Sequence, residues 1–272
     1  MLVLLELAHF KISNLLLKMN VYNKLNVGLT RIFVFLFLFS FSCKKHEEQK
    51  NYIETEPLIN TIRDIDGNVY HTVKIGNQVW MVENLRTTSF RNGEPITLVL
   101  NNNQWANIYA GAYCYYGNDT SNIRLYGNLY NWTAINDSRK LAPVGWHVAS
   151  AYDWNKLAKF LDSEVSDTIS IGGYNSLIAG GKLKVVGTNN WNIPNTGATN
   201  EIGFTALPGG YRTADGLYTG IKVSGCWWTS SEFPFINGSS DAINQVLFYN
   251  NTYIGTYNSS YYTGYAVRCV KD

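Results

Sequence analysis

Downstream of about residue 60, short stretches of alternating hydrophobic and polar residues are separated by turn-forming dipeptides. Alternation with a period of two is typical of half-buried β-strands. The dipeptides Asp66-Gly67 and Gly76-Asn77 supply the positive φ angles that tight hairpin turns need. They predict two consecutive hairpins, whose three strands are "TIRDI" (61–65), "NVYHTVKI" (68–75) and "QVWMVENL" (78–85).

One segment has the period of an amphipathic helix instead. Its apolar residues fall at positions i, i+3, i+4 and i+7, namely Trp154, Leu157, Ala158 and Leu161. Ser150 precedes this stripe and Asp153 follows three residues later, which is a capping-box arrangement. The pattern predicts one main helix near residues 150–163, capped at its start by Ser150.

The C-terminal third returns to strand patterns and contains no second long helix. Its predicted strands are "GLYTGIKV" (216–223), "GCWWTSSE" (225–232), "AINQVLFY" (242–249) and "GYAVRCV" (264–270). Strands do not alternate with helices and there is no internal repeat, which argues against a parallel α/β sheet. We therefore expect an α+β domain with short antiparallel strands.

The N-terminal region has the features of an export signal. An eleven-residue apolar run from Ile32 to Ser42 follows a basic residue, has the length of a signal-peptide core and is too short for a stable membrane anchor. We interpret 1–42 as a signal peptide, with Met19 as an alternative start. Cys43 then resembles the lipidated cysteine of a bacterial lipoprotein; the alternative is an ordinary secretory signal cleaved nearby.

This interpretation divides the chain into three parts and predicts its location. Residues 43–60 are polar and charged, and form a lipidated cysteine with a flexible tether. Residues 61–272 form the folded domain. We expect an exported lipoprotein held by its lipid anchor in the outer membrane, and the sequence favours neither leaflet.

Composition agrees with an exported β-rich domain and excludes one class of partner. Aromatic residues make up 14% of the chain and charged residues only 15%, and the formal net charge is +2. Without residues 1–42 the chain keeps 18 basic and 19 acidic residues. Neither balance supplies the positive field with which a protein binds nucleic acid, so we expect no nucleic-acid partner.

The chain lacks the motifs of common catalytic and metal sites. Nothing has metal-ligand spacing, no cofactor fingerprint is present, and the acidic segment "DIDGN" (64–68) lacks the glycine and glutamate of a calcium loop. A base at His147 serving Cys114 or Cys226 is conceivable, because such pairs are spatial. A packed, hydrogen-bonded histidine is the more common arrangement. We predict no catalytic residues, no metal and no cofactor.

The sequence contains more residues typical of ligand binding than of catalysis. The segment "FYNNTYIGTYNSSYYTGY" (248–265) combines aromatic and small polar residues, as recognition loops do, although a solvent-facing β-hairpin would have the same composition. In "SGCWWTSSEF" (224–233), strand alternation places the two tryptophans on opposite faces, so at most one can meet a ligand. The candidate ligand-binding residues are Trp228, Tyr249, Asn251, Tyr253, Tyr257 and Tyr261.

Seven ordered blocks resemble a known family. The blocks are "DIDGNVYHTVKIGNQVWMVENLRT", "LYNWTAI", "GWHVASAYDWNKL", "GGKLK", "GFTALPGGYR", "WWTSSE" and "GYAVRCV". Over residues 61–272 the chain resembles the Fibrobacter succinogenes major paralogous domain of exported lipoproteins in Bacteroidetes and Fibrobacteres. The resemblance implies a C-type lectin-like fold, in which the "GWHVASAYDW" unit comes early and the "WWTSSE" and "VRCV" strands pair late. It supplies no catalytic residues.

Departures from the family pattern affect the cysteines and the sugar site. Ala142 stands where relatives have a cysteine, and Cys226 replaces an aromatic residue. The resemblance therefore suggests a relocated disulfide between Cys226 and Cys269, with a buried thiol as the alternative role of Cys226. Trp191 and Asn192 are followed by Ile193, so the calcium-dependent sugar site of lectins does not carry over.

These observations lead to one functional expectation and two rivals. We expect a non-catalytic binding module for a glycan or a cell-surface protein. A structural or adhesion-accessory envelope protein is the first rival. An enzyme of the formylglycine-generating type is the second, and it would require a reactive pair of thiols. Diversification of the C-terminal segment by a retroelement is a further idea that its Asn, Tyr, Ser and Thr content allows.

Overall fold

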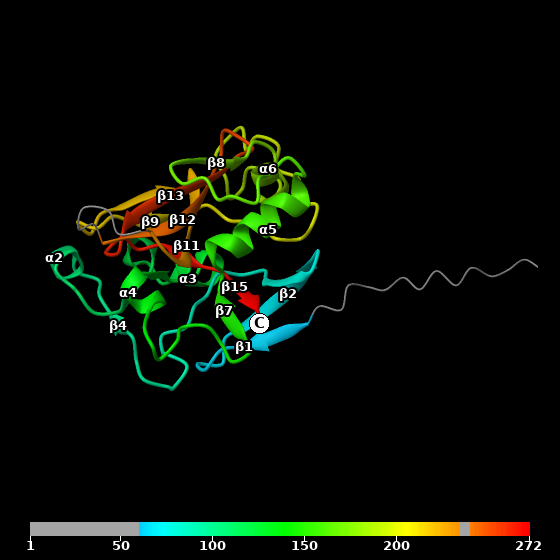
Figure 1. Cartoon of the computed structure of the whole chain (residues 1–272). Coiled ribbons are helices and arrows are strands. Elements are labelled where there is room, and N and C mark those ends of the chain that lie inside the picture. Colours follow the sequence, from blue (N-terminus) through cyan, green and yellow to red (C-terminus); the bar gives the residue numbers. More distant parts are fainter. Residues whose placement is uncertain (1–59, 234–239) are drawn as a thin grey trace, which may run out of the picture. The chain divides into compact units, whose positions relative to one another are not determined.

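The computed structural model describes residues 60–233 and 240–272, which are mostly strands with a few helices (Figure 1). The α+β prediction is confirmed. The strands are β1 Thr61–Arg63, β2 Val69–Ile75, β3 Gln78–Met81, β4 Thr97–Leu98, β5 Ala112–Cys114, β6 Leu129–Tyr130, β7 Trp146–Val148, β8 Gly173–Ser176, β9 Gly209–Arg212, β10 Tyr218–Ile221, β11 Ser224–Glu232, β12 Asp241–Phe248, β13 Ile254–Ser260, β14 Ala266–Val267 and β15 Cys269–Lys271. The helices are α2 Asn102–Ala106, the 3₁₀ turn η1 Tyr116–Asn118, α3 Ser121–Tyr126, α4 Trp132–Ile135, α5 Ala151–Leu161 and α6 Ala179–Leu183.

The two predicted N-terminal hairpins are present. β1 pairs with β2 and β2 with β3, all antiparallel. Gly67 and Gly76 sit in the turns with φ angles of 83° and 57°, a region that glycine enters without steric cost. The turn chemistry therefore fixed the register of these strands, as the dipeptides indicated.

Five strands form a sheet that joins distant parts of the chain. Its order is β1-β2-β3-β15-β7, so the last strand lies between the second hairpin and the strand that leads into α5. β15 is antiparallel to both neighbours. Figure 1 shows β15 and β7 beside β1 and β2.

Helix α5 forms as its sequence predicts. Ser150 accepts a hydrogen bond from the Asp153 backbone amide, and the Asp153 carboxylate accepts one from the Ser150 backbone amide, which completes the capping box. The predicted apolar stripe is buried throughout, and it consists of Trp154, Leu157, Ala158 and Leu161. The helix ends at Leu161, two residues before the predicted end.

The second sheet contains the strand with the two tryptophans. Its seven strands follow the order β10-β9-β11-β12-β13-β8, with β14 paired to β11. Trp227 lies in a first core, where its ring contacts Trp154 of α5 at 5.6 Å between centroids. Trp228 lies in a second core under Tyr265, at 4.8 Å. Strand alternation therefore works as predicted, but both faces of β11 are covered at this point.

A buried arginine joins the two sheets. Arg268 lies between β14, which belongs to the seven-stranded sheet, and β15, which belongs to the five-stranded sheet. Its guanidinium donates to the carbonyl oxygens of Met81 and Phe204 and to Asn84 Oδ1, at 2.8–3.1 Å. Asn84 Oδ1 also accepts the indole N–H of Trp227 at 2.8 Å. Arg268 thus binds β3 directly, through Met81, and β11 indirectly, through Asn84.

Replacing this guanidinium tests its structural role. We expect Arg268→Lys to lower the free energy of unfolding by about 2–4 kcal/mol, because an ammonium cannot reach all three acceptors and leaves buried carbonyls without donors. Urea unfolding followed by tryptophan fluorescence measures the loss. The control is Arg124→Lys, on an exposed face of α3, which we expect to stay within about 0.5 kcal/mol of the parent. Equal losses in the two variants would contradict the assignment.

Candidate functional site

A row of aromatic side chains lies on the face of the seven-stranded sheet opposite α5. We call it the aromatic face, and its residues are Tyr174, Tyr211, Phe248, Tyr253 and Tyr257. Tyr211, Phe248 and Tyr257 pack against the outer side of the second core and remain partly exposed. Tyr174 on the edge strand β8 is opposite Gly255 and is 47% exposed. The face therefore crosses the sheet from β8 to β9.

Three of these rings form a cluster in which Tyr174 contacts both Tyr253 and Tyr257. A Cβ at position 255 would lie 2.5 Å from Cε2 of Tyr257, so the Tyr257 ring lies directly over Gly255. The rings of Tyr174 and Tyr253 are 4.6 Å apart between centroids. Burial and a hydrogen bond with Tyr174 raise the pKa of Tyr257. Only glycine leaves room for this arrangement, which presents hydroxyl groups beside aromatic rings.

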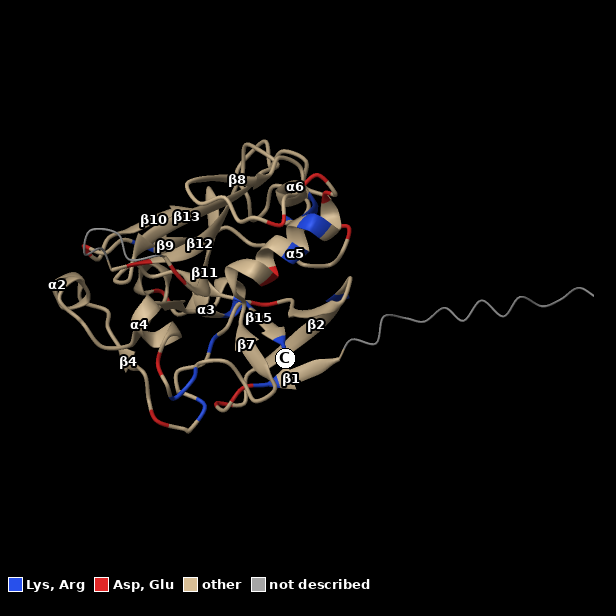
Figure 2. Ribbon diagram, in the orientation of Figure 1, with Lys and Arg blue, Asp and Glu red and all other residues tan. Residues whose placement is uncertain are grey.

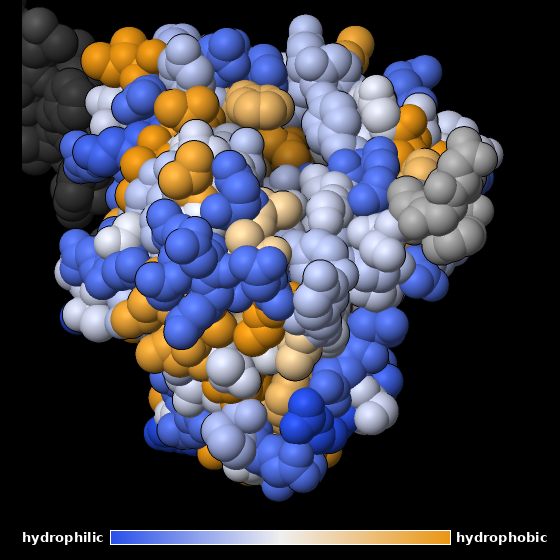
Figure 3. All heavy atoms as spheres, turned by 90° about the vertical axis from the view of Figure 1, so that its left-hand side faces the viewer, coloured by the Kyte–Doolittle hydropathy of each residue, from blue (hydrophilic) through white to orange (hydrophobic). Residues whose placement is uncertain are grey.

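The aromatic face is nearly free of charge. The seven strands of its sheet contain only three charged residues, which are Arg212, Glu232 and Asp241. Arg212 is fully buried. Figure 2 shows most of this sheet in tan, with charged residues mainly in the loops and on α5. Figure 3 views the side on which α2 and β4 lie, where hydrophobic residues form separate patches among hydrophilic ones. An aromatic face with so few charged residues around it suits a neutral partner better than a highly charged one.

Two of the six predicted ligand-binding residues lie on this face, Tyr253 and Tyr257. The prediction for Trp228 is wrong, because its side chain is fully buried beneath Tyr265 and donates its indole N–H to the Tyr130 carbonyl. A side chain with no exposed surface cannot stack on a ligand.

The other three predicted residues lie elsewhere. Tyr249 packs against the first core, on the opposite side of the sheet. The Asn251 carbonyl accepts a hydrogen bond from Lys184, and its side chain accepts one from the Tyr253 backbone amide. Tyr261 follows the end of β13 and packs against the second core as Tyr257 does, but its ring stacks on Trp132 at 4.4 Å and is not part of the cluster with Tyr174. The six residues therefore do not form one surface.

Sequence reasoning missed Tyr174, Tyr211 and Phe248. The segment 248–265 contains β13, which forms a hairpin with β12, as the second interpretation of that segment proposed. β8 joins its edge from about 80 residues earlier in the chain, and no local pattern indicates that pairing. Tyr211 lies in the family block "GFTALPGGYR" and Phe248 in the predicted strand "AINQVLFY". Alternation along a strand separates its two faces but does not indicate which face remains exposed in the fold.

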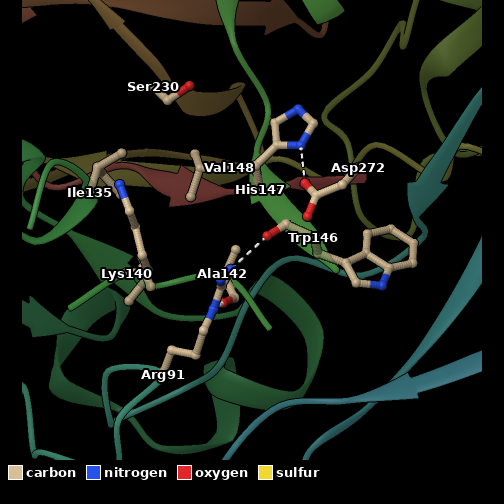
Figure 4. A pocket seen from close by; sticks show the side chains of 10 residues that line it. Arg91, Ile135, Lys140, Ala142, Trp146, His147, Val148, Ser230 and Asp272 are labelled. Atoms are coloured by element: carbon tan, nitrogen blue, oxygen red, sulfur yellow. Dashed lines mark hydrogen bonds and ion pairs between the residues drawn. The ribbon is translucent and has the colours of Figure 1, made fainter. Parts of the chain in front are cut away.

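A small pocket lies on another part of the domain. Its volume is about 280 Å³, and it lies beside β7, α4 and the loop that precedes β7. The pocket is lined by Arg91, Ile135, Lys140, Leu141, Ala142, Trp146, His147, Val148, Ser230 and Asp272. Figure 4 shows Lys140 on one side and His147 with Asp272 on the other. Arg91 holds the loop in place by donating to the carbonyls of Ala142, Pro143 and Trp146 at 2.7–2.9 Å.

His147 is held between two carboxylates. Its Nε2 lies 3.1 Å from Asp153 and its Nδ1 2.8 Å from Asp272. The hydrogen bond with Asp153, followed by that with Asp272, raises the pKa of His147 against the opposing effect of burial. Burial also opposes ionisation of Asp153, but hydrogen bonds from His147 and Ser150 lower its pKa to about 2. The histidine therefore links the helix cap to the strand end, and among the described residues its hydrogen-bond partners are these two carboxylates and no cysteine.

Most of the chain matches the profile of a known protein family. The profile of the Fibrobacter succinogenes major domain matches residues 73–271. The chain belongs to the Fibrobacter succinogenes major domain family. The family resemblance seen in the sequence is thus confirmed. No curated protein and no solved structure matches the chain.

The matched region includes the whole aromatic face and most of the pocket. In this Fibrobacter succinogenes major domain, β1 and Asp272 lie just outside the match. Within residues 60–233 and 240–272 no group of three or more His, Cys, Asp or Glu side chains could hold a metal ion. No helix in these ranges is long and apolar enough to span a membrane. Residues 1–42 and Cys43 lie outside the described part of the chain.

The predicted bridge between Cys226 and Cys269 is wrong. Both cysteines, and Cys114, are buried free thiols. Cys226 is on β11, whose neighbours are β9, β12 and β14, whereas Cys269 is on β15 between β3 and β7. The two strands belong to different sheets and are not neighbours, so the expectation of adjacent strands fails. Burial raises the pKa of Cys114 to about 11 and that of Cys226 to about 12, so neither thiol is activated.

Thiol labelling tests this arrangement in the family member. We expect Cys114, Cys226 and Cys269 to resist an alkylating reagent in the native protein, because all three are buried, and to be labelled after denaturation without reductant. Peptide mass spectrometry after each treatment assigns the label. A Cys226–Cys269 cross-linked peptide would contradict the structure.

The pH dependence of stability tests the histidine. A raised pKa at His147 stabilises the fold fully below the ordinary value of 6.5, and this contribution disappears as pH rises through the raised value. A lowered pKa at Asp153 stabilises the fold fully above 3.8, and this contribution disappears as pH falls toward about 2. The stability difference between parent and His147→Gln should therefore be largest between about pH 4 and pH 6.5.

The size of this difference is limited because the imidazole is well exposed. We expect less than about 1 kcal/mol after screening by solvent, measured by urea unfolding across the pH range. His71→Gln is the control, since the His71–Glu83 pair is an exposed contact that does not touch a helix cap. A difference for His147→Gln that is constant from pH 4 to pH 9 would contradict the linkage.

Proposed function

We propose that this protein is an exported cell-envelope lipoprotein whose domain is a non-catalytic binding module. Its ligand is a glycan or a cell-surface protein, bound at the aromatic face. The observation that carries the proposal is the cluster of Tyr174, Tyr253 and Tyr257. Export, the signal peptide 1–42 and lipidation at Cys43 rest on the sequence, as does the location in the outer membrane.

The chemistry of the cluster supports recognition of this kind. Tyrosine presents a large rigid ring for stacking and a hydroxyl for hydrogen bonding, and it loses little conformational entropy on binding. Sugar rings have apolar C–H faces bordered by hydroxyls, so they match rings bordered by phenol groups. The absence of charge along the strands around the cluster agrees with a neutral glycan as one ligand class.

A C-type lectin-like fold is part of the proposal. Two features support it. β7 leads directly into the capped helix α5, and late in the chain Trp227 and Trp228 of β11 pair with β14 through Ala266 and Val267. The first feature corresponds to the strand–helix unit that the family resemblance implies. The second corresponds to the late strand pairing only at Val267, because Cys269 and Val270 belong to β15 in the other sheet.

A structural or adhesion-accessory role is the second candidate. Several hydrophobic side chains outside the aromatic face are well exposed, among them Val144 at 81% and Ile193 at 77%. Scattered singly, such side chains are common on monomeric proteins, so they give this role less support than the tyrosine cluster gives binding. An enzyme of the formylglycine-generating type has less support, because the thiols are buried, free and of raised pKa.

Substitution of the tyrosines tests the binding proposal. We expect binders to be found by a glycan array and by pull-down of surface proteins with the purified protein. Tyr257→Ala should weaken binding about tenfold, because a stacked ring contributes on the order of 1 kcal/mol beyond its buried area. Tyr174→Ala with Tyr253→Ala should remove the remaining affinity.

The matched control is Tyr152→Ala, on the exposed side of α5. We expect it to leave binding unchanged, since α5 lies on the opposite side of the sheet from the aromatic face. Binding that survives removal of all three tyrosines would reject the aromatic face as the site. Pull-down of envelope components by the triple variant would favour the structural role.

A further inference from the structure

The pocket beside α4 and β7 is a site of a second kind. We propose that it binds a small monocarboxylate, whose charged end pairs with Lys140 and whose apolar body lies against Ile135, Leu141 and Val148. This site is separate from the aromatic face, so either can fail without the other. The charge balance, the backbone at Lys140 and the residues that line the pocket together support it.

Lys140 has no acidic partner among the described residues. The ion pairs of these residues do not include it. Two acids of the neighbouring segments, Asp137 and Glu94, are both bound by Arg139, at 2.8 and 2.7 Å. Arg139 therefore uses the negative charge that would otherwise neutralise its neighbour. The Lys140 amine is left with its positive charge directed to the pocket (Figure 4).

The backbone at Lys140 is in a conformation that favours glycine. Its φ angle is 63°, held by a hydrogen bond from its own amide to the Asp137 carbonyl and by one from the Arg91 amide to its carbonyl. A long side chain in the left-handed region is strained, and such positions cluster at functional sites. Glycine would also satisfy this turn. Lys222 has the same φ angle and does not line the pocket, so the backbone supports the proposal only together with the position of the Lys140 side chain.

The remaining walls define the rest of the ligand. Ile135, Leu141 and Val148 supply a narrow apolar surface, since each is less than 8% exposed, and the Ser230 hydroxyl lies at the side shown at the top of Figure 4. The volume of about 280 Å³ lies at the small end of the range for ligand pockets. It suits a ligand with one charged group and a short hydrocarbon body.

The opposite side of the pocket restricts the charge of the ligand. Asp272 is 56% exposed there and interacts with His147, which also contacts Asp153. Arg91 directs its hydrogen bonds to carbonyl groups of the loop and leaves Lys140 as the cation for a ligand. A second anionic group on the ligand would face Asp272 and be repelled, so the site selects monocarboxylates over dicarboxylates.

Saturation-transfer difference NMR on the purified full-length protein tests the proposal. The probe is 4-methylpentanoate, with the isosteric amide 4-methylpentanamide and the matching amine as comparisons. We expect a saturable signal from the carboxylate with a dissociation constant on the order of 1 mM. The amide and the amine should bind at least about tenfold more weakly, because only the carboxylate pairs with Lys140.

Three substitutions at one position separate binding from folding. Lys140→Met and Lys140→Gly should each weaken the carboxylate at least about tenfold, and Lys140→Arg should retain it. Lys140→Gly should leave the melting temperature unchanged or raise it, since glycine relieves the strained φ angle. Lys156→Met, on the exposed side of α5, is the matched control and should bind like the parent. Asp272→Asn should bind about threefold more tightly, because it removes a repulsive charge.

Several outcomes would overturn the proposal. They are the absence of a saturable signal, equal binding of the amide, or full binding by Lys140→Gly in a protein that melts normally. Weaker binding by Asp272→Asn would also reject a monocarboxylate, since it would show that Asp272 attracts the ligand. That result would assign a ligand with a positive group at this end.

Discussion

The contact between Arg268 and the groups around it is the constraint on which the rest of this fold depends. A guanidinium buried without a carboxylate is costly, and its charge is tolerated only when most of its donors find acceptors. Here the acceptors come from β3, from the segment around Phe204 and from Asn84, which also accepts the Trp227 indole. Burial lowers the pKa of Arg268 to about 9, which still leaves it charged at neutral pH. The two sheets can meet only where all these groups converge.

Other buried cations repeat this solution in the irregular segments. Arg212 donates to the carbonyls of Val99, Leu100 and Gly216 while lying between the rings of Trp105 and Tyr218. Lys184 donates to two carbonyls at the β12–β13 turn. Chains with few helices leave many carbonyls outside regular ladders, and side-chain donors must satisfy them. These contacts anchor the loops from within, so the loops do not depend on the sheet face that carries Tyr174, Tyr253 and Tyr257 for the hydrogen bonds named here.

Local sequence signals were sufficient to predict the hairpins, the start of α5 and the two faces of β11. Asp66-Gly67 and Gly76-Asn77 gave the hairpins, Ser150 and Asp153 gave the start of α5, and alternation separated Trp227 from Trp228 into two cores. Whether a face of a strand is exposed depends on what packs over it from elsewhere in the chain. Tyr265 covers Trp228 and no pattern around residues 224–233 indicates it.

Long-range pairing limited the prediction of the sites in the same way. Tyr174 meets Tyr257 only because β8 adds to the sheet edge, and Cys226 is far from Cys269 in strand order only because β15 crosses to the other sheet. Lys140 drew no attention in the sequence, since its φ angle and the loss of Asp137 and Glu94 to Arg139 are properties of the folded turn. Residues whose role depends on a distant neighbour carry no local signal.

The position of β15 also sets when this domain can fold. β15 is the last of the described strands, yet it lies inside its sheet, between β3 and β7. During synthesis the ribosome delivers the chain from its N-terminus, at roughly 5–20 residues per second. The first hairpins therefore wait unpaired on one edge until Cys269–Lys271 emerges. Until those residues emerge, the edge of β3 that faces β15 has no partner in its sheet, and an unpaired strand edge of this kind is a place where another chain can pair.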